Sequence, residues 1–458
     1  MIDSIILMTE KIKISLFPFS GAGMSASEGP GITPAMPACA KRHDGSDGQK
    51  PRGHTRLLIM ADDLTGTADS AVGATRAGLA TAVVLGAEHI ERADVVAIDL
   101  DSREVSAAEA TQRHRLALTT WQGHFRFLFK KIDSTLRGNV AAEIASLSSV
   151  GMAIVAPAYP ATGRTTRGGR QYLNGVPVEE TEVWTNEGLQ GRADLVEMLT
   201  AAALETATLD LEGLGQKDDH VLAVLEAHQA RGVQALVCDV ESDADLARLA
   251  TLSARLDGVF WVGSAGLGEH LPGALGLSGS HSVEPMPPGH PQTLIVIGSM
   301  SGVSHRQAEQ LLESVDALTL IDIDASDLRQ DAAIDVVSAL EARLDAALAQ
   351  HCDVMVRLRQ NKDRCAAEGP ALSLALARLL SPRLERVERL IATGGATARA
   401  ILMGANITRL TLVDAPDTGM ARLLAITTAG PLEVITKAGG FGDDHAFQRV
   451  WQGQTRHH

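Results

Sequence analysis

The sequence lacks the signatures of several well-known protein classes. Its four cysteines form no CxxC pair, which excludes a zinc ribbon and a thioredoxin-type redox motif; they are Cys39, Cys238, Cys352 and Cys365. The patterns HExxH, GxSxG and GxxxxGKS/T are absent, which excludes a zincin protease, a lipase-type serine hydrolase and a P-loop enzyme. No run of 18 apolar residues occurs, so we expect no transmembrane helix and no membrane partner.

Positive charge is also scarce. The chain has 41 Lys and Arg residues against 56 Asp and Glu residues, a net charge of −15, so we expect no nucleic acid partner. With 45% hydrophobic and 21% charged residues the composition is that of a globular protein, and 458 residues exceed the length that one core spans. Cys238 lies in the apolar run ALVCDV and fits a small core residue, so we expect a reducing, cytoplasmic compartment.

Residues 1–55 differ from the rest of the chain. They contain several prolines and a polar run without helical or strand periodicity, and they lack a cleavage site for a signal peptide. We therefore interpret residues 1–55 as a disordered extension, or as the result of a misplaced start codon with Met24 and Met36 as alternative starts. A loose glycine-rich pattern at Gly21 is similar to the nucleotide loop of sirtuins, but the zinc-binding cysteine quartet of that family is absent.

From Arg56 onward, short apolar runs alternate with helical patterns, which is typical of βα units and a mostly parallel sheet. We expect helices over 67–80 and 106–121. The predicted strands cover 57–60, 82–85, 95–100, 125–132, 153–158, 235–240, 259–267, 294–299, 317–324, 354–358, 390–393, 409–413 and 432–436. The stretch 282–292 has four prolines and no periodicity, so we predict a linker there. The fold class is then two α/β domains with mostly parallel sheets, at 56–282 and 293–452, and an active-site cleft between them.

Polar residues after the strands are the candidates for a site, because ligands of open α/β sheets bind outside the carboxyl ends of the strands. Asp62 and Asp63 directly follow the first predicted strand. Paired carboxylates there can bind substrate hydroxyls, act as a general base or hold Mg²⁺. The alternative is an ordinary helix N-cap.

Cationic residues follow three further strands. Arg103 can clamp a carboxylate with two hydrogen bonds, although a surface arginine fits the same pattern. The segment 130–139 combines cations with a carboxylate and a hydroxyl, a set that suits an anionic polyol or, alternatively, a solvated helix start: Lys130, Lys131, Asp133, Ser134 and Arg137. The glycine-rich stretch 157–175 carries Arg164, Arg167 and Arg170, and fits a binding loop as well as a surface hairpin.

Three glycine-rich turns follow strands in the second predicted domain: GSMSG at 298–302, TGGAT at 393–397 and KAGGFGDD at 437–444. Glycine lets the backbone approach a phosphate, and a helix N-terminus offers unpaired N–H groups. One such turn is an ordinary βα connection, but three of them in one domain favour a nucleotide site. Histidines show no metal-ligand spacing, so the sequence assigns no metal ligands.

These segments, in this order, resemble the family of four-carbon acid sugar kinases. The motifs are ADDLTG at 61–66, KxDSTLRG at 131–138, PAxPxxGRTT at 157–166, GS-x-S at 298–301, TGG-x-T at 393–397 and K-x-G-x-FG at 437–442. The resemblance extends from Arg56 to Trp451. It implies ATP-dependent phosphorylation of the O4 hydroxyl of D-threonate, D-erythronate or 3-oxo-tetronate, and the sequence at 437–444 favours the D-threonate branch.

Together with the resemblance, these turns give a hypothesis for the roles of individual residues. We expect Asp62 or Asp63 to accept the O4 proton, with Asp443, which follows a glycine turn, as the rival. The residues expected to bind the sugar acid are Asp62, Asp63, Arg103, Lys131, Asp133, Ser134, Arg137 and Arg164. Those expected to bind ATP, with Mg²⁺, are Ser299, Ser301, Gly394, Gly395, Ala396, Thr397, Lys437, Gly439 and Gly440. A homodimer is compatible with the sequence, and the competing functions are a non-catalytic sensor of a sugar acid and a nucleotide, and a lyase.

Overall fold

The computed structural model describes residues 55–90, 93–283, 291–329, 333–360 and 368–454. The predicted extension, apart from Thr55, and residues 284–290 of the predicted linker lie outside the described residues. Residues 55–283 are called the N-terminal half below, and residues 291–454 the C-terminal half.

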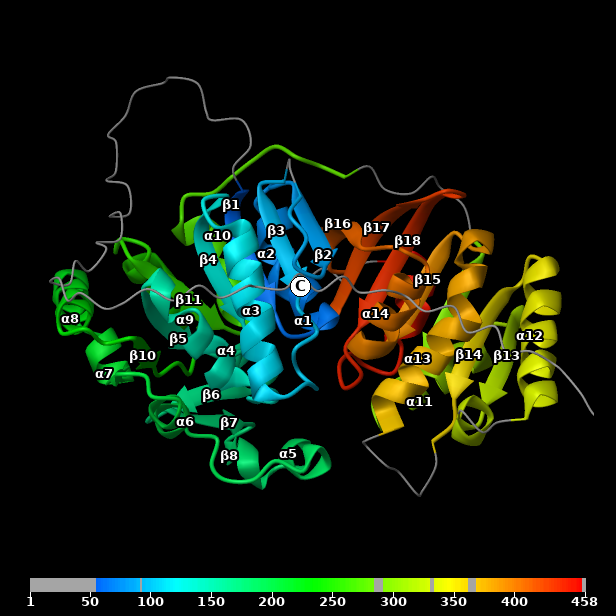
Figure 1. Cartoon of the computed structure of the whole chain (residues 1–458), viewed down its shortest axis with the longest axis horizontal. Coiled ribbons are helices and arrows are strands. Elements are labelled where there is room, and N and C mark those ends of the chain that lie inside the picture. Colours follow the sequence, from blue (N-terminus) through cyan, green and yellow to red (C-terminus); the bar gives the residue numbers. More distant parts are fainter. Residues whose placement is uncertain (1–54, 91–92, 284–290, 330–332, 361–367, 455–458) are drawn as a thin grey trace, which may run out of the picture. The chain divides into compact units, whose positions relative to one another are not determined.

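One sheet runs through both halves of the described chain (Figure 1). Its strand order is β13-β14-β12-β15-β18-β17-β16-β2-β3-β1-β4-β11-β5-β10-β9. The strands of the N-terminal half are β1 (Thr55–Ala61), β2 (Thr81–Leu85), β3 (Val95–Asp99), β4 (Phe125–Lys131), β5 (Met152–Ala156), β9 (Thr206–Leu209), β10 (Ala235–Cys238) and β11 (Val259–Gly263). Those of the C-terminal half are β12 (Thr293–Ile297), β13 (Leu318–Ile323), β14 (Asp353–Leu358), β15 (Arg389–Thr393), β16 (Arg409–Asp414), β17 (Met420–Thr427) and β18 (Gly430–Lys437).

Most neighbouring strands are parallel, so the predicted α/β class with a mostly parallel sheet is confirmed. The antiparallel pairs are β2 with β16, β16 with β17, and β17 with β18. The pairing of β16 with β2, from Arg409 opposite Val84 to Thr411 opposite Ala82, joins the two halves. The sheets of the two predicted domains are therefore one continuous sheet.

Both faces of the sheet are buried. In β1, Leu57 and Ile59 belong to the core on one face, and Leu58 and Met60 belong to the core on the other, as the twofold period of a strand requires. Burial on both faces explains why the strands have continuous apolar runs rather than alternating patterns.

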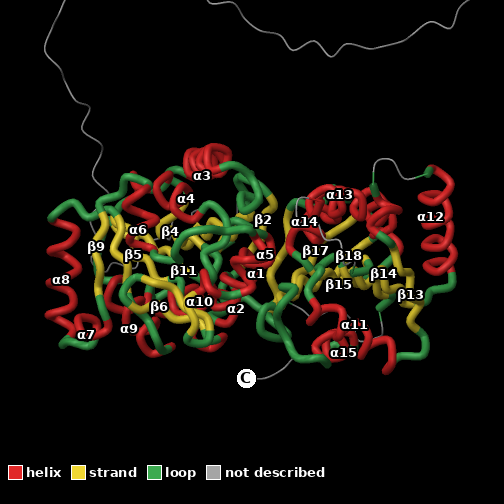
Figure 2. The backbone as a smooth tube through the Cα atoms, turned by 90° about the horizontal axis from the view of Figure 1, so that it is seen from below, coloured by secondary structure: helices red, strands yellow, loops and turns green. Residues whose placement is uncertain are grey.

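Helices cover both faces of the sheet, as the view along it shows (Figure 2). The helices of the N-terminal half are α1 (Leu64–Ser70), α2 (Val72–Arg76), α3 (Ala107–Trp121), α4 (Val140–Ser146), α5 (Glu182–Glu187), α6 (Leu195–Ala201), α7 (Leu211–Leu214), α8 (Asp218–Ala230), α9 (Asp243–Ser253) and α10 (Ala265–Ala274). Those of the C-terminal half are α11 (Gly302–Ser314), α12 (Ile334–Ala349), α13 (Gly369–Leu380), α14 (Gly395–Gly404) and α15 (Ala446–Trp451). No helix of the described chain is both long and apolar enough to cross a membrane.

Two differences from the sequence expectation lie near the strand ends. The predicted helix 67–80 begins earlier, at Leu64, because Asp63 caps it, and it breaks into α1 and α2. The predicted strand 259–267 ends at Gly263, because Ser264 caps α10. Residues 164–177 form a small antiparallel sheet of β6 (Arg164–Arg167), β7 (Arg170–Leu173) and β8 (Val176–Pro177), so the stretch 157–175 contains a hairpin, one of the two alternatives that its sequence left open.

Candidate active site

A cavity of about 560 Å³ lies at the carboxyl ends of strands from both halves. The turns after β1, β4, β5 and β11 line it from the N-terminal half, and the turns after β12, β15 and β18 line it from the C-terminal half. The strands end at the same edge because they are parallel, so residues far apart in the sequence meet there.

Four helices begin at this cavity, and their first residues or N-caps line it: Asp63 for α1, Ser264 for α10, Ser301 for α11 and Gly394 for α14. The first N–H groups of a helix have no partner within the helix and carry positive potential. The convergence of four such termini makes the cavity favourable for anions.

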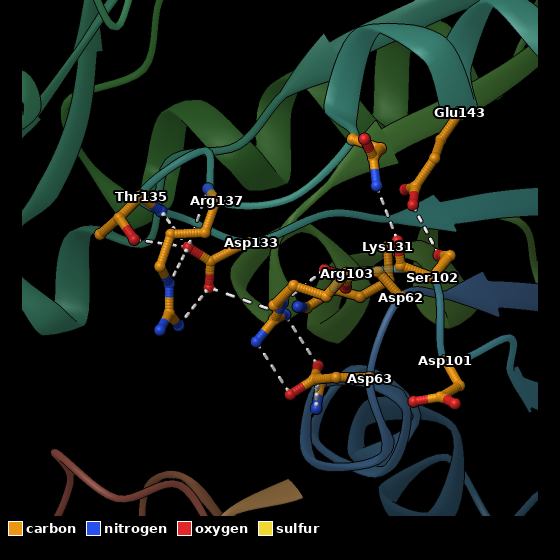
Figure 3. A network of polar contacts seen from close by, with 12 residues as sticks. Asp62, Asp63, Asp101, Ser102, Arg103, Lys131, Asp133, Thr135, Arg137 and Glu143 are labelled. Atoms are coloured by element: carbon orange, nitrogen blue, oxygen red, sulfur yellow. Dashed lines mark hydrogen bonds and ion pairs between the residues drawn. The ribbon is translucent and has the colours of Figure 1, made fainter. Parts of the chain in front are cut away.

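Arg103 joins the two aspartates of the ADDLTG turn (Figure 3). Its Nε donates to Asp62 Oδ2 at 2.7 Å, and its Nη1 and Nη2 donate to the two carboxylate oxygens of Asp63 at 3.0 and 2.9 Å. Asp62 lies behind the cavity wall and is 2% exposed. Burial raises the pKa of Asp62, but Arg103 and neighbouring lysines outweigh it and lower that pKa to about 2. Asp62 therefore acts as a fixed negative charge that holds Arg103.

Asp133 has a similar relation to Arg137. Arg137 donates from Nε and Nη2 to the carboxylate of Asp133 at 3.0 and 2.9 Å, and the N–H of Thr135 adds a bond of 3.1 Å. Although burial opposes ionisation, Arg137 and Arg103 hold the pKa of Asp133 well below its ordinary value. The charges of Arg103 and Arg137 are thus compensated by carboxylates within the protein.

Two other cations of the cavity lack a carboxylate partner within the described part of the chain. Lys131 is 5% exposed, and its Nζ would lie 2.7 Å from a Cβ atom on Gly66. Arg164 stacks on the ring of Phe441, 4.9 Å from its centroid, and donates to the carbonyl of Thr162 at 3.1 Å. The Nε atom of Arg164 is buried without a partner, and burial lowers the pKa of this guanidinium. These two side chains are available to an anionic ligand.

The glycine-rich turns of the C-terminal half form the opposite wall. It contains Ser299, Ser301, Gly394, Gly395, Gly439 and Gly440. A Cβ atom on Gly395 would lie 2.8 Å from Thr65 Oγ1 and 3.1 Å from Asp63 Oδ2, so α14 begins directly against the start of α1. The phosphate-type turns and the aspartate turn are therefore in contact, although they come from different halves.

Five residues predicted for the site lie outside this cavity, and Asp62, behind the cavity wall, is the first of them. Thr397 is 3% exposed and packs on Gly298, whereas Ala396 lines a separate groove between α13 and α14. Lys437 is buried beneath its own turn, where Nζ donates to the carbonyls of Ala438 and Gly439 at 3.0 and 3.3 Å. Asp443 is exposed and accepts from Arg449 Nη1 at 2.8 Å, which places this rival base on the surface.

Several residues of the cavity were missed by the sequence reasoning: Thr65, Asp69, Tyr159, Ser264 and Phe441. Asp69 follows Asp63 and Gly66 at the spacing i, i+3, i+6, which puts all three on one face of α1. A predicted helix that starts at Leu64 instead of Thr67 would have placed Asp69 on the same face as Asp63. Ser264 follows a strand and a glycine, the same signal that identified the turns of the C-terminal half.

Comparison with known protein families matches the two halves separately. A family model described as a sugar-binding N-terminal domain matches residues 57–271. A family model described as a nucleotide-binding C-terminal domain matches residues 294–447.

Three curated relatives are similar along almost their whole length. A D-threonate kinase of Cupriavidus necator is 42% identical over 87% of this chain and 98% of its own. A D-threonate kinase of Salmonella typhimurium is 31% identical over 85% of this chain and 96% of its own. A 3-oxo-tetronate kinase of Methylobacterium radiotolerans is 29% identical over 86% of this chain and 98% of its own.

Among solved structures, a protein of Salmonella typhimurium LT2 has the same fold. The TM-score is 0.74 at 19% sequence identity, and the match covers 87% of this chain and 100% of that chain. At this identity the likeness concerns the fold alone.

Proposed function

The chain belongs to the family of four-carbon acid sugar kinases, and we propose that it transfers the γ-phosphoryl group of ATP to the O4 hydroxyl of D-threonate. The observation that carries this proposal is the single cavity in which the cationic and acidic turns of the N-terminal half face the glycine-rich turns of the C-terminal half. Phosphoryl transfer needs the two substrates in line and positive charge around the transferred phosphoryl group. The wall of the N-terminal half would bind the sugar acid, and the wall of the C-terminal half would bind ATP.

The described contacts support a division of roles among the cations. Arg103 and Arg137 are already paired with aspartates, so they fix the carboxylates of Asp63 and Asp133 as acceptors for the substrate hydroxyls. Arg164 carries uncompensated charge on the sugar-acid side and suits the substrate carboxylate. Lys131 carries uncompensated charge beside the start of α1 and suits the transferring phosphoryl group.

ATP would lie against the wall of the C-terminal half. The Ser299 turn, the start of α14 and the turn at Gly439 leave backbone N–H groups next to the cavity. Lys437 contributes indirectly in this arrangement, because its buried ammonium group holds the carbonyls of the third turn.

The residues present do not make a protein-built magnesium site. No group of three or more His, Cys, Asp and Glu side chains in the described part of the chain is placed to hold a metal ion. Asp63 and Asp133 also have their oxygens occupied by arginines. We therefore expect Mg²⁺ to enter on the phosphates of ATP.

The proposed function is tested by ADP release in a coupled assay with MgATP and, separately, D-threonate, D-erythronate and 3-oxo-tetronate. We expect the highest kcat/KM with D-threonate, and we expect phosphorus NMR to place the phosphate on O4. A higher kcat/KM with another of the acids would move the chain to that branch of the family. ATP binding without ADP release for all three would contradict the proposal.

The tight contact between Gly298 and α14 gives a prediction for the nucleotide wall. A Cβ atom at Gly298 would lie 2.4 Å from Oγ1 and 2.6 Å from Cγ2 of Thr397. Overpacking of about 1–3 kcal/mol would displace the start of α14, so Gly298→Ala should raise the KM for ATP roughly ten- to a hundredfold. The KM for D-threonate should change less.

The matched control is Gly302→Ala in the same turn, because the nearest atom to its Cβ, Arg306 Nη1, is 3.7 Å away. Steady-state kinetics with each substrate varied in turn measure both constants. Equal KM values for ATP in the two variants would show that the packing of Gly298 on Thr397 does not shape the nucleotide wall.

A further inference from the structure

One carboxylate of the cavity has no role in the arrangement described so far. Three carboxylates line the cavity in the described part of the chain, namely Asp63, Asp69 and Asp133. Asp63 and Asp133 are engaged by Arg103 and Arg137. The carboxylate of Asp69 makes no hydrogen bond and no ion pair with any described residue, although the residue is half-buried.

We propose that Asp69 is the general base that accepts the proton of the substrate's O4 hydroxyl. This inference rests on the proposed kinase function and assigns the base that the sequence had placed at Asp62, Asp63 or Asp443. A base must present an oxygen lone pair to the substrate hydroxyl, and Asp69 is the cavity carboxylate to which no arginine of the described chain is hydrogen-bonded.

The position of Asp69 between the two walls supports the assignment. It lies on the cavity face of α1, and the first turn of this helix contacts the start of α14 through Thr65 and Gly395. Lys131 packs over the same face of α1 at Gly66. The carboxylate therefore faces the space where the sugar acid of one wall would meet the phosphates held by the other, beside the cation suited to the transferring group.

Charged and titratable groups act on Asp69 from α1, α2, α10, β4, β6 and the turn after β5. The acidic groups are Asp63 on α1 itself, Glu269 on α10 and Tyr159 after β5, and the cationic groups are Arg76 on α2, Lys131 on β4 and Arg164 on β6. Burial is the main cause that raises the pKa of Asp69 to about 6, with support from Glu269 and Asp63 against Lys131 and Arg76. A carboxylate with this pKa is largely ionised at neutral pH, yet it is a much stronger base than Asp62, whose pKa is about 2.

A lone pair of O4 forms the bond to Pγ, and the bond between Pγ and the bridging oxygen breaks, so that its electron pair leaves with ADP. The O4 proton passes to the carboxylate of Asp69, which later releases it to water. Lys131 offsets the negative charge of the phosphoryl group throughout.

The test is the variant Asp69→Asn, measured with the complete chain, MgATP and the sugar acid that the wild type turns over. The substitution keeps the shape of the side chain and removes its basicity, so kcat should fall about 10²–10⁴-fold. The Kd for ATP, measured by calorimetry, and the thermal unfolding midpoint should stay unchanged. The wild type should lose kcat/KM on the acidic side of about pH 6, because Asp69 becomes protonated, and the variant should lack this acidic limb.

Glu269→Gln is the matched control. Glu269 does not line the cavity, and it forms an ion pair of 3.3 Å with Arg76 and accepts from the hydroxyl of Tyr159 at 3.3 Å. Because its charge raises the pKa of Asp69, the control should keep the wild-type kcat at pH 8 and move the acidic limb to lower pH. ATP titrates identically in the assays of all variants. A shift of the acidic limb of the pH profile between variants therefore reports a group of the enzyme.

Several outcomes would overturn the assignment. Turnover by Asp69→Asn within threefold of wild type would exclude Asp69 as the base, and so would an acidic limb that Glu269→Gln leaves in place. Recovery of the variant by raised Mg²⁺ or by Mn²⁺ would make Asp69 a metal ligand instead. If Asp69→Asn does not fold, the shift of the acidic limb in Glu269→Gln tests whether Asp69 is the base. An inactive wild type would contradict the proposed function rather than this inference.

Discussion

Lys131→Met is expected to lower kcat by about 10³-fold or more, while ATP and D-threonate still bind. The reason is the distribution of charge in the cavity. Arg103 and Arg137 are neutralised by Asp62, Asp63 and Asp133, so their charge is already committed. Lys131 lacks such a partner in the described part of the chain. A cation without a carboxylate partner stabilises the transition state most strongly when it lies beside the phosphoryl group, where negative charge moves during the reaction.

The measurement for Lys131→Met is steady-state ADP release combined with calorimetric binding of ATP. Uniform loss of binding would raise KM and leave kcat unchanged, whereas loss of transition-state stabilisation lowers kcat. Lys217→Met is the control for removal of a positive charge, because Lys217 is exposed at the start of α8. A kcat within tenfold of wild type would contradict the prediction and move the role to Arg164, the other uncompensated cation.

Lys130→Met is expected to destabilise the protein by about 3–5 kcal/mol. Lys130 precedes Lys131 on β4, but its side chain points to the opposite face of the sheet and is 0% exposed. Its Nζ lies 2.8 Å from Oε2 of Glu143, which is 1% exposed. Removal of the ammonium group would leave the carboxylate of Glu143 buried without its cation, and that penalty is larger than the energy of the intact pair.

The same ion pair also supports the cavity. Oε1 of Glu143 accepts from Ser102 Oγ at 2.6 Å (Figure 3). Lys130 Nζ donates to the carbonyl of Lys131 at 2.8 Å. Ser102 precedes Arg103, so the pair holds the turn that carries this arginine. Part of the activity should therefore be lost in Lys130→Met even at temperatures where the variant is folded.

Urea unfolding followed by circular dichroism measures the loss of stability. The double variant Lys130→Met with Glu143→Gln removes both charges, and it should be more stable than Lys130→Met alone. A loss below 1 kcal/mol in the single variant would contradict the prediction, because it would mean that water or another cation reaches Glu143.

The sequence by itself determined the strands and the edge where the site lies. Runs such as LLIM at 57–60 are apolar at every position because both faces of the sheet are buried, and their lengths predict strands. Polar and glycine-rich turns after parallel strands must meet at one edge, so Asp63, Lys131, Ser299 and Gly394 were expected together and line one cavity. These features depend on local periodicity and on the geometry of parallel strands.

Only the tertiary structure decided which of these residues remain available to a ligand. The antiparallel pairing of β2 with β16 joins the halves through residues more than 300 positions apart, and no local pattern encodes it. Likewise, the sequence pointed to Asp62 and Asp63 as candidate bases and did not point to Asp69. Arg103 contacts Asp62 and Asp63, whereas the carboxylate of Asp69 has no hydrogen-bond or ion-pair partner among the described residues. Both results depend on distances between separate elements. Local propensity does not specify such distances, because they result from the packing of the whole sheet.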